Sequence, residues 1–128
     1  MSLNVSTELA TKAQNEPISD TEFISVIKDS LPNAWQIVES LVQRKKSGEV
    51  GVVQHAPRSM EDNDRGQLLR MMASDSMRGA LQRHFGLVFA FQNCHATAAF
   101  FPSETEEHRQ WTSINSQILN QSPELRDC

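Results

Sequence analysis

The feature that most constrains the fold of this chain is its densest apolar run, residues 86–102. Bulky residues occupy every second position from Leu87 to Phe91, which is the period of a β-strand. After Asn93-Cys94 the chain becomes apolar again, and Asn tolerates the positive φ of a tight two-residue turn. The run therefore predicts an antiparallel hairpin over residues 87–101. A four-residue turn over 92–95 is the alternative.

Small side chains give this hairpin a second property. Ala90, Ala96 and Ala98 leave one surface shallow, so that a helix or another subunit can pack close to it. We therefore expect the hairpin to form a central part of the sheet that is covered on both sides.

Helical patterns dominate the chain before the hairpin. Ser19 and Glu22 have the spacing of a capping box, and Pro32 ends the helix that they begin. A second helix follows, with Ser30 or Asn33 available as its cap, and three cations at 44–46 lie where the helix dipole favours them before Gly48. Residues 50–57 are rich in valine and predict a strand.

Further helices are predicted on either side of the hairpin. Apolar spacing indicates a helix after the acidic residues 61–64, a bend around 74–76 and a second helical segment that ends at Gly86. After the hairpin, Ser103 and Glu106 have the spacing of a second capping box, and a narrow apolar stripe continues to Leu119. Such a stripe needs a groove in its own domain or in a second subunit.

The sequence thus predicts one α+β domain over residues 18–121, with an antiparallel sheet of about three strands packed with four to five helices. A mostly α-helical bundle with a short hairpin is the alternative. The polar segment 1–17 is expected to be a flexible tail, and residues 122–128 a second tail.

Charge is unevenly distributed along the 128 residues. The net charge of −4 divides into −3 over residues 1–32, −3 over residues 102–128 and +2 between them. Acidic flanks do not favour nucleic acid or an anionic membrane as a partner. No apolar stretch approaches the ~18 residues of a transmembrane helix, so no membrane partner is expected.

The two cysteines, Cys94 and Cys128, are too few for the disulfide framework of a small secreted protein. The N-terminal residues lack the basic and apolar regions of a signal peptide. We therefore expect a cytoplasmic protein with reduced thiols.

The candidates for ligand or metal chemistry are four residues: Cys94, His95, His55 and His84. None of them has the spacing of a ligand pair, although His55 ends one predicted strand and His95 begins another. The simpler interpretation is a buried thiol and a hydrogen-bonded turn histidine. We expect no cofactor, and no residue is assigned a catalytic role.

Residues 66–85 also permit a helix-turn-helix hypothesis, in which Arg78, Gln82 and Arg83 would face DNA. Five arginines between positions 58 and 83 are opposed by four acidic residues, which is a poor electrostatic footprint for nucleic acid.

These observations favour a non-enzymatic interaction, accessory or regulatory protein that associates with itself and whose partner is another protein. The alternatives are a small metal- or ligand-binding protein or thiol-dependent enzyme centred on Cys94 and His95, and DNA binding through residues 66–85.

Overall fold

The computed structural model describes residues 3–121, which form seven helices and three strands. The elements are α1 (Thr7–Asn15), α2 (Asp20–Ser30), α3 (Pro32–Lys46), β1 (Val53–His55), α4 (Asp62–Ala73), α5 (Asp75–Phe85), β2 (Val88–Gln92), β3 (Ala96–Phe100), α6 (Thr105–Trp111) and α7 (Ile114–Leu119). The predicted α+β class is confirmed. There are more helices than expected, because α1 forms within the predicted tail and the last predicted helix is divided at residues 112–113.

The sheet is antiparallel throughout, with the strand order β1-β3-β2. The predicted hairpin is confirmed, with β2 and β3 paired from Val88 opposite Phe100 to Gln92 opposite Ala96. The strands are separated by three residues, Asn93 to His95, and not by the predicted two. The amide of His95 donates to the carbonyl oxygen of Gln92 at 3.4 Å, which agrees with the alternative of a four-residue turn over 92–95. Asn93 and Cys94 have φ values of 56° and 54°. The central strand is β3, and all five of its residues are buried.

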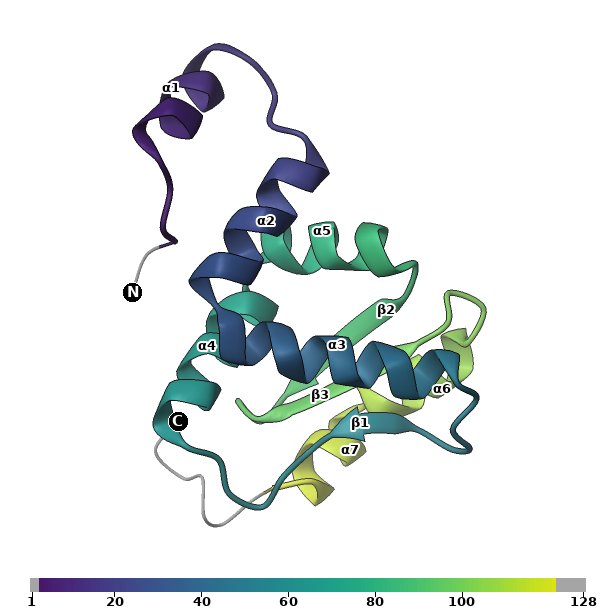
Figure 1. Cartoon of the computed structure of the whole chain (residues 1–128). Coiled ribbons are helices and arrows are strands. Elements are labelled where there is room, and N and C mark those ends of the chain that lie inside the picture. The colour runs from purple at the N-terminus through teal and green to yellow at the C-terminus, as the bar shows by residue number, and fades with distance from the viewer. Residues whose placement is uncertain (1–2, 122–128) are drawn as a thin grey trace.

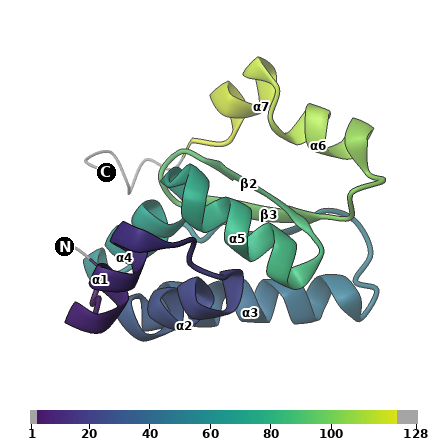
Figure 2. The same cartoon turned by 90° about the horizontal axis from the view of Figure 1, so that it is seen from above.

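Each face of the sheet is covered by its own layer of helices. Phe89 and Ala99 pack with helices α2 to α5, in the larger of the two core clusters. Ala90, Ala98 and Phe100 point the other way and pack against Trp111 at the end of α6. The two layers lie on opposite sides of the strands in Figure 2. The expectation that the hairpin is covered on both sides is therefore confirmed, and α6 of the same chain covers the alanine surface.

The start of α2 depends on local sequence, and that of α3 does not. Ser19 and Glu22 form the predicted capping box. Helix α3 begins at Pro32 without a cap from either predicted side chain. Instead the Oε1 atom of Gln67, from α4, accepts hydrogen bonds from the amides of Asn33 at 2.8 Å and Ala34 at 3.2 Å. A side chain distant in sequence thus satisfies the free amides at this helix start.

The second predicted capping box does not form. Helix α6 begins after Glu104, with no side-chain cap, and Glu106 pairs with Arg109. The carboxylate of Glu104 accepts from the amide of Phe101 at 2.6 Å and lies 2.7 Å from the Nζ atom of Lys45. Because Lys45 is only 6% exposed, its cation requires such a partner, which draws Glu104 to the end of α3.

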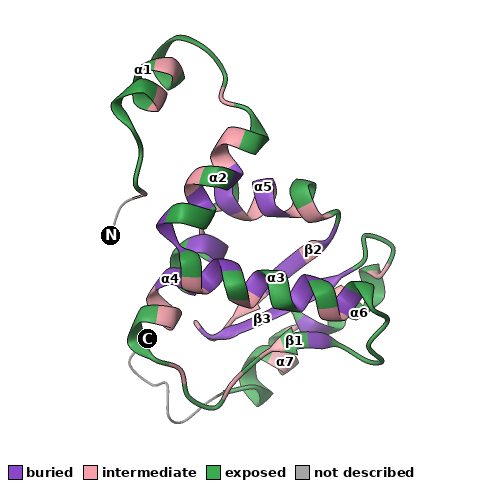
Figure 3. Cartoon of the chain, in the orientation of Figure 1, coloured by how far each residue is buried: buried purple, intermediate pink, exposed green. Residues whose placement is uncertain are grey.

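Helix α1 differs from the other helices in its surroundings. It extends from the main body in Figure 1, and Figure 3 shows it as largely exposed. None of its nine residues is buried. The predicted flexibility of residues 1–17 stays a prediction, and the predicted tail 122–128 lies outside the described residues.

No helix in the described part of the chain is long and apolar enough to cross a membrane.

Replacing Gln67 by Met tests the cap of α3. The change keeps the length of the side chain but leaves two amides without their acceptor, so we expect it to lower the free energy of unfolding by about 1–2 kcal/mol. Urea denaturation followed by circular dichroism measures this. Gln43→Met on the exposed side of α3 is the matched control, and an equal loss in both variants would contradict the role of Gln67.

Candidate binding site

The pairing of β1 with β3 places two of the predicted residues, His55 and His95, near each other. His55 lies opposite Thr97 in the β1–β3 pairing, and His95 directly precedes β3. His95 is 4% exposed, and its Nδ1 atom lies 2.6 Å from the carbonyl oxygen of Asn93. This geometry fits the simpler interpretation of His95 as a hydrogen-bonded turn residue.

Cys94 lies in the same turn and is disulfide-bonded. The expectation of a reduced thiol is therefore wrong for this residue. Its sulfur is occupied, so it offers neither a nucleophile nor a thiolate ligand while the bond is intact. Cys128, the other cysteine of the chain, lies outside the described residues. Disulfides are uncommon in cytosolic proteins, and the cytoplasmic location stays a prediction.

The side chain of Asn93 in this turn also contacts the C-terminal end of α7. The Nδ2 atom of Asn93 donates to the carbonyl oxygen of Asn120 at 2.8 Å, and the side-chain amides of Gln117 and Gln121 donate to its Oδ1 atom. One turn residue thereby holds the end of α7 against the sheet.

His84 does not join the other candidates. It lies on α5, which packs beside β2, whereas His55 lies on β1 at the opposite edge of the sheet. Its ring contacts the Phe85 ring edge to face at a centroid distance of 4.7 Å, and it lies tilted to the Trp35 ring at 6.1 Å. Residues 3–121 contain no group of three or more His, Cys, Asp or Glu side chains that could hold a metal ion.

The predicted DNA-contacting side chains are engaged within the chain. Arg78 donates to the carbonyl oxygen of Met72 at 2.6 Å and pairs with Asp75 at 2.7 Å. The Oε1 atom of Gln82 accepts from the amide of Phe89 at 3.0 Å, which fixes the start of β2. These contacts give both residues a structural explanation, and DNA binding stays a prediction.

A polar hollow of about 440 Å³ surrounds His55, and Arg44 and Asp64 contribute to its lining. Burial lowers the pKa of His55 below its ordinary value, and the nearby Arg44 cation lowers it further, whereas Asp64 acts in the opposite direction. The Arg44 guanidinium is already paired with Glu49 at 2.6 Å. Among its described lining residues, the hollow therefore presents a neutral imidazole and no unpaired cation for an anionic ligand.

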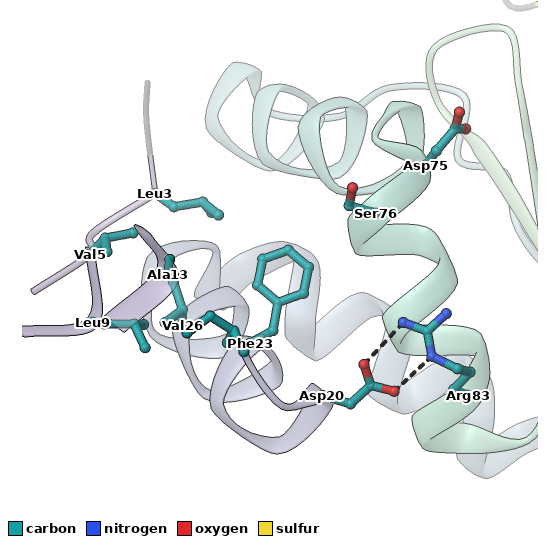
Figure 4. A pocket seen from close by; sticks show the side chains of 11 residues that line it. Leu3, Val5, Leu9, Ala13, Asp20, Phe23, Val26, Asp75, Ser76 and Arg83 are labelled. Carbon is teal, nitrogen blue, oxygen red and sulfur yellow. Dashed lines mark hydrogen bonds and ion pairs between the residues drawn. The ribbon is translucent and has the colours of Figure 1, made fainter. Parts of the chain in front are cut away.

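An apolar hollow of about 480 Å³ lies between the N-terminal segment, α2 and α5, and we call it the arm pocket. Figure 4 shows its side chains, most of them apolar, with an ion pair at one side. Its lining residues are Leu3, Val5, Leu9, Ala13, Ile18, Asp20, Phe23, Val26, Asp75, Ser76 and Arg83. The ion pair joins Arg83 to both carboxylate oxygens of Asp20, at 2.7 and 3.0 Å.

One wall of this pocket is the segment formed by residues 3–18, which we call the N-terminal arm. Two polar contacts join it to α2: the ion pair of Lys12 with Glu22 at 2.9 Å, and the hydrogen bond from the Asn4 amide to the Ser30 Oγ atom at 2.8 Å. Leu3 also packs against the larger core cluster. The sequence interpretation of residues 1–17 as a tail missed this wall. The sequence does contain one signal for a helix in this segment. The hydroxyl of Ser6 caps α1 by accepting a hydrogen bond from the amide of Leu9.

The lowered pKa of His55 gives a pH-dependent prediction. Because the folded chain binds this proton more weakly than the unfolded chain, folding loses stability as the pH falls below the ordinary histidine value of 6.5. We expect an NMR titration of His55 to have its midpoint below 6.5, and Arg44→Gln to raise it. Arg83→Gln is the control, and it should leave the midpoint of the His55 titration unchanged. A midpoint at or above 6.5 would contradict the half-buried position of His55 beside Arg44.

Comparison with known proteins gives one family. No curated protein and no solved structure matches the chain. The model of the family described as "NucS shadow ORF" matches residues 1–128, the full length of the sequence. The chain therefore belongs to the NucS shadow ORF family.

Proposed function

We propose that the protein is a non-enzymatic interaction module that associates with itself through the arm pocket. The observation that carries this proposal is the apolar lining of a hollow of about 480 Å³. Exposed apolar hollows of this size are typical of binding sites, because filling them removes apolar surface from water.

The charges beside the pocket support an apolar occupant. Asp20 and Arg83 satisfy each other, and Asp75 pairs with Arg78. Each of the three charged lining residues therefore has a partner within the chain, and an occupant does not need to neutralise it. The contacts left for an occupant are mainly those with aliphatic side chains such as Leu9 and Val26.

A second apolar surface supports association with another protein chain. On α7 the side chains of Ile114, Ile118 and Leu119 are 78%, 66% and 80% exposed. Of the narrow apolar stripe predicted for the last helix, Trp111 is buried in its own domain, and these three residues remain exposed. Exposed aliphatic side chains in one group are typical of protein interfaces.

A charge introduced into the pocket tests the proposal. Val5 lines the arm pocket and is 48% exposed, whereas Val50 lies in the α3–β1 connection and is 95% exposed. We expect Val5→Arg to weaken self-association at least about tenfold, because each copy would have to bury a guanidinium group in an apolar contact. Val50→Arg, which makes the same chemical change, should leave association as it is. Sedimentation velocity over a range of concentrations measures both.

Two results would refute the proposal. One is a chain that stays monomeric at high concentration. The other is an association that Val5→Arg and Val50→Arg weaken equally, since the contact would then depend on charge and not on the arm pocket.

Nucleic-acid binding is the second candidate, because the family name KH_NucS_shadow begins with KH. The same letters denote an RNA-binding module whose G-x-x-G loop clamps backbone nucleotides. This chain has Gly48 and Gly51 at that spacing, both with positive φ, but the loop between them contains Glu49. The loop contains no cation, and Glu49 pairs with the nearby Arg44 guanidinium at 2.6 Å, so we propose that nucleic acid is not the partner.

Fluorescence anisotropy with random-sequence single-stranded RNA and duplex DNA tests this second candidate. We expect no saturable binding at about 50 mM salt and no gain on lowering the salt further. Tight binding that falls steeply with salt would overturn the expectation. Glu49→Gln is the informative variant, since it removes the carboxylate with which Arg44 pairs and keeps the length of the loop.

A further inference from the structure

We propose that a cavity beside the β2–β3 turn binds a small uncharged cyclic ureide, a ring in which a carbonyl group lies between two N–H groups. We call this hollow the turn cavity. It shares no described lining residue with the arm pocket, so this inference goes beyond the self-association proposed above.

The turn cavity has a volume of about 250 Å³ and is more enclosed than the arm pocket. An ordered water takes about 30 Å³, so the cavity has room for a small organic ring, although it is smaller than the ~300–1,000 Å³ of sites for drug-sized ligands. Its described lining residues include no Asp, Glu, Lys or Arg, which favours an uncharged ligand. The polar side chains of the lining, beside the indole of Trp111, are Gln54, Gln92, Asn93, His95 and Asn120.

His95 contributes a ring nitrogen that the chain leaves unused. Its Nδ1 atom lies 2.6 Å from the carbonyl oxygen of Asn93, and because a carbonyl oxygen only accepts, Nδ1 carries the proton. The Nε2 atom of the neutral ring is then an acceptor. In the described part of the chain, the sealed polar side-chain atoms without a partner are Trp35 Nε1 and Thr97 Oγ1, so His95 Nε2 stays reachable from the cavity. A side chain that is only 4% exposed needs a partner for this atom, and the cavity is where that partner can lie.

The chemistry of their partners also determines which atoms of two glutamines remain for a ligand. The Nε1 atom of Trp111 donates to the Oε1 atom of Gln54 at 3.0 Å, so the amide nitrogen of Gln54 remains as a donor. The amide nitrogen of Gln92 donates to the carbonyl oxygen of Trp111, so the Oε1 atom of Gln92 remains as an acceptor.

The wall of the turn cavity therefore offers one amide donor group and two acceptors. Two N–H groups on either side of a carbonyl group are complementary to this set, and that arrangement defines a cyclic ureide. A cyclic imide has the reverse arrangement, one N–H group between two carbonyl groups. It would leave one acceptor of the wall without a donor and one of its own carbonyl groups without a partner, which costs binding free energy.

Titration of the full-length chain with ethylene urea and with uracil tests the proposal. NMR spectra of isotope-labelled protein report the indole N–H of Trp111 in the wall of the cavity, with that of Trp35 as the reference outside it. We expect saturable shifts of the Trp111 signal with a dissociation constant of about 1 mM or tighter. Succinimide, a cyclic imide with the same ring size as ethylene urea, should bind at least about tenfold more weakly.

His95→Asn tests the role of the ring nitrogen. The asparagine amide nitrogen can replace Nδ1 as the donor to the Asn93 carbonyl group, but nothing replaces Nε2. We expect this variant to bind ethylene urea about tenfold more weakly. His84→Asn makes the same chemical change on α5, outside the cavity, and should leave the affinity unchanged.

Because His95 is buried, a second variant changes an exposed wall residue. Gln54→Met removes the donor to the carbonyl group of ethylene urea, and we expect a similar loss of affinity. Gln43→Met on the exposed side of α3 is its matched control. Near-ultraviolet circular dichroism checks that each variant is folded, and Gln54→Met decides the question if His95→Asn does not fold.

Three results would overturn the inference. The first is a Trp111 signal that responds to neither ureide, in which case the cavity holds ordered water only. The second is equal binding of succinimide and ethylene urea. The third is an affinity for ethylene urea that the wall variants and their controls change equally. Each of these results leaves the test of the arm pocket with Val5→Arg unaffected, so the two proposals stand or fall separately.

Discussion

The structure depends on one constraint: the central strand β3 is buried on both faces. Its alternating side chains need two apolar layers, and one chain supplies both, with α2 to α5 on one side and α6 on the other. The alanine residues of the hairpin allow the indole of Trp111 to reach the sheet. This arrangement uses, within one chain, the surface that the sequence offered for a helix or a second subunit.

The periphery is organised around charged pairs that join distant segments. Lys45 and Glu104 tie the end of α3 to the connection that leads into α6, across the edge of the sheet. Asp20 and Arg83 tie α2 to α5 and border the arm pocket. Exposed ion pairs such as Asp20–Arg83 each contribute little to the free energy of unfolding. The main effect of the Asp20–Arg83 pair is positional, because it joins the two helices between which the apolar hollow opens.

The sequence allowed prediction of the features that short segments determine. The capping box of Ser19, the turn at Asn93 and the end of α5 at Gly86 depend on neighbouring residues, and each is present. The features that were missed depend on distant partners. Glu104 pairs with a buried lysine, the N-terminal arm forms one wall of a hollow with α2 and α5, and the disulfide of Cys94 cannot be inferred from spacing alone.

The cap that Gln67 provides for α3 has a consequence for the order of folding. Helix α2 carries its own start signal and can form as soon as its residues are free. The first turn of α3 has its amides satisfied only when α4 lies beside it, so the two helices must stabilise each other at the same step. Helices α3 and α4 are therefore expected to form together, whereas α2 can form before them.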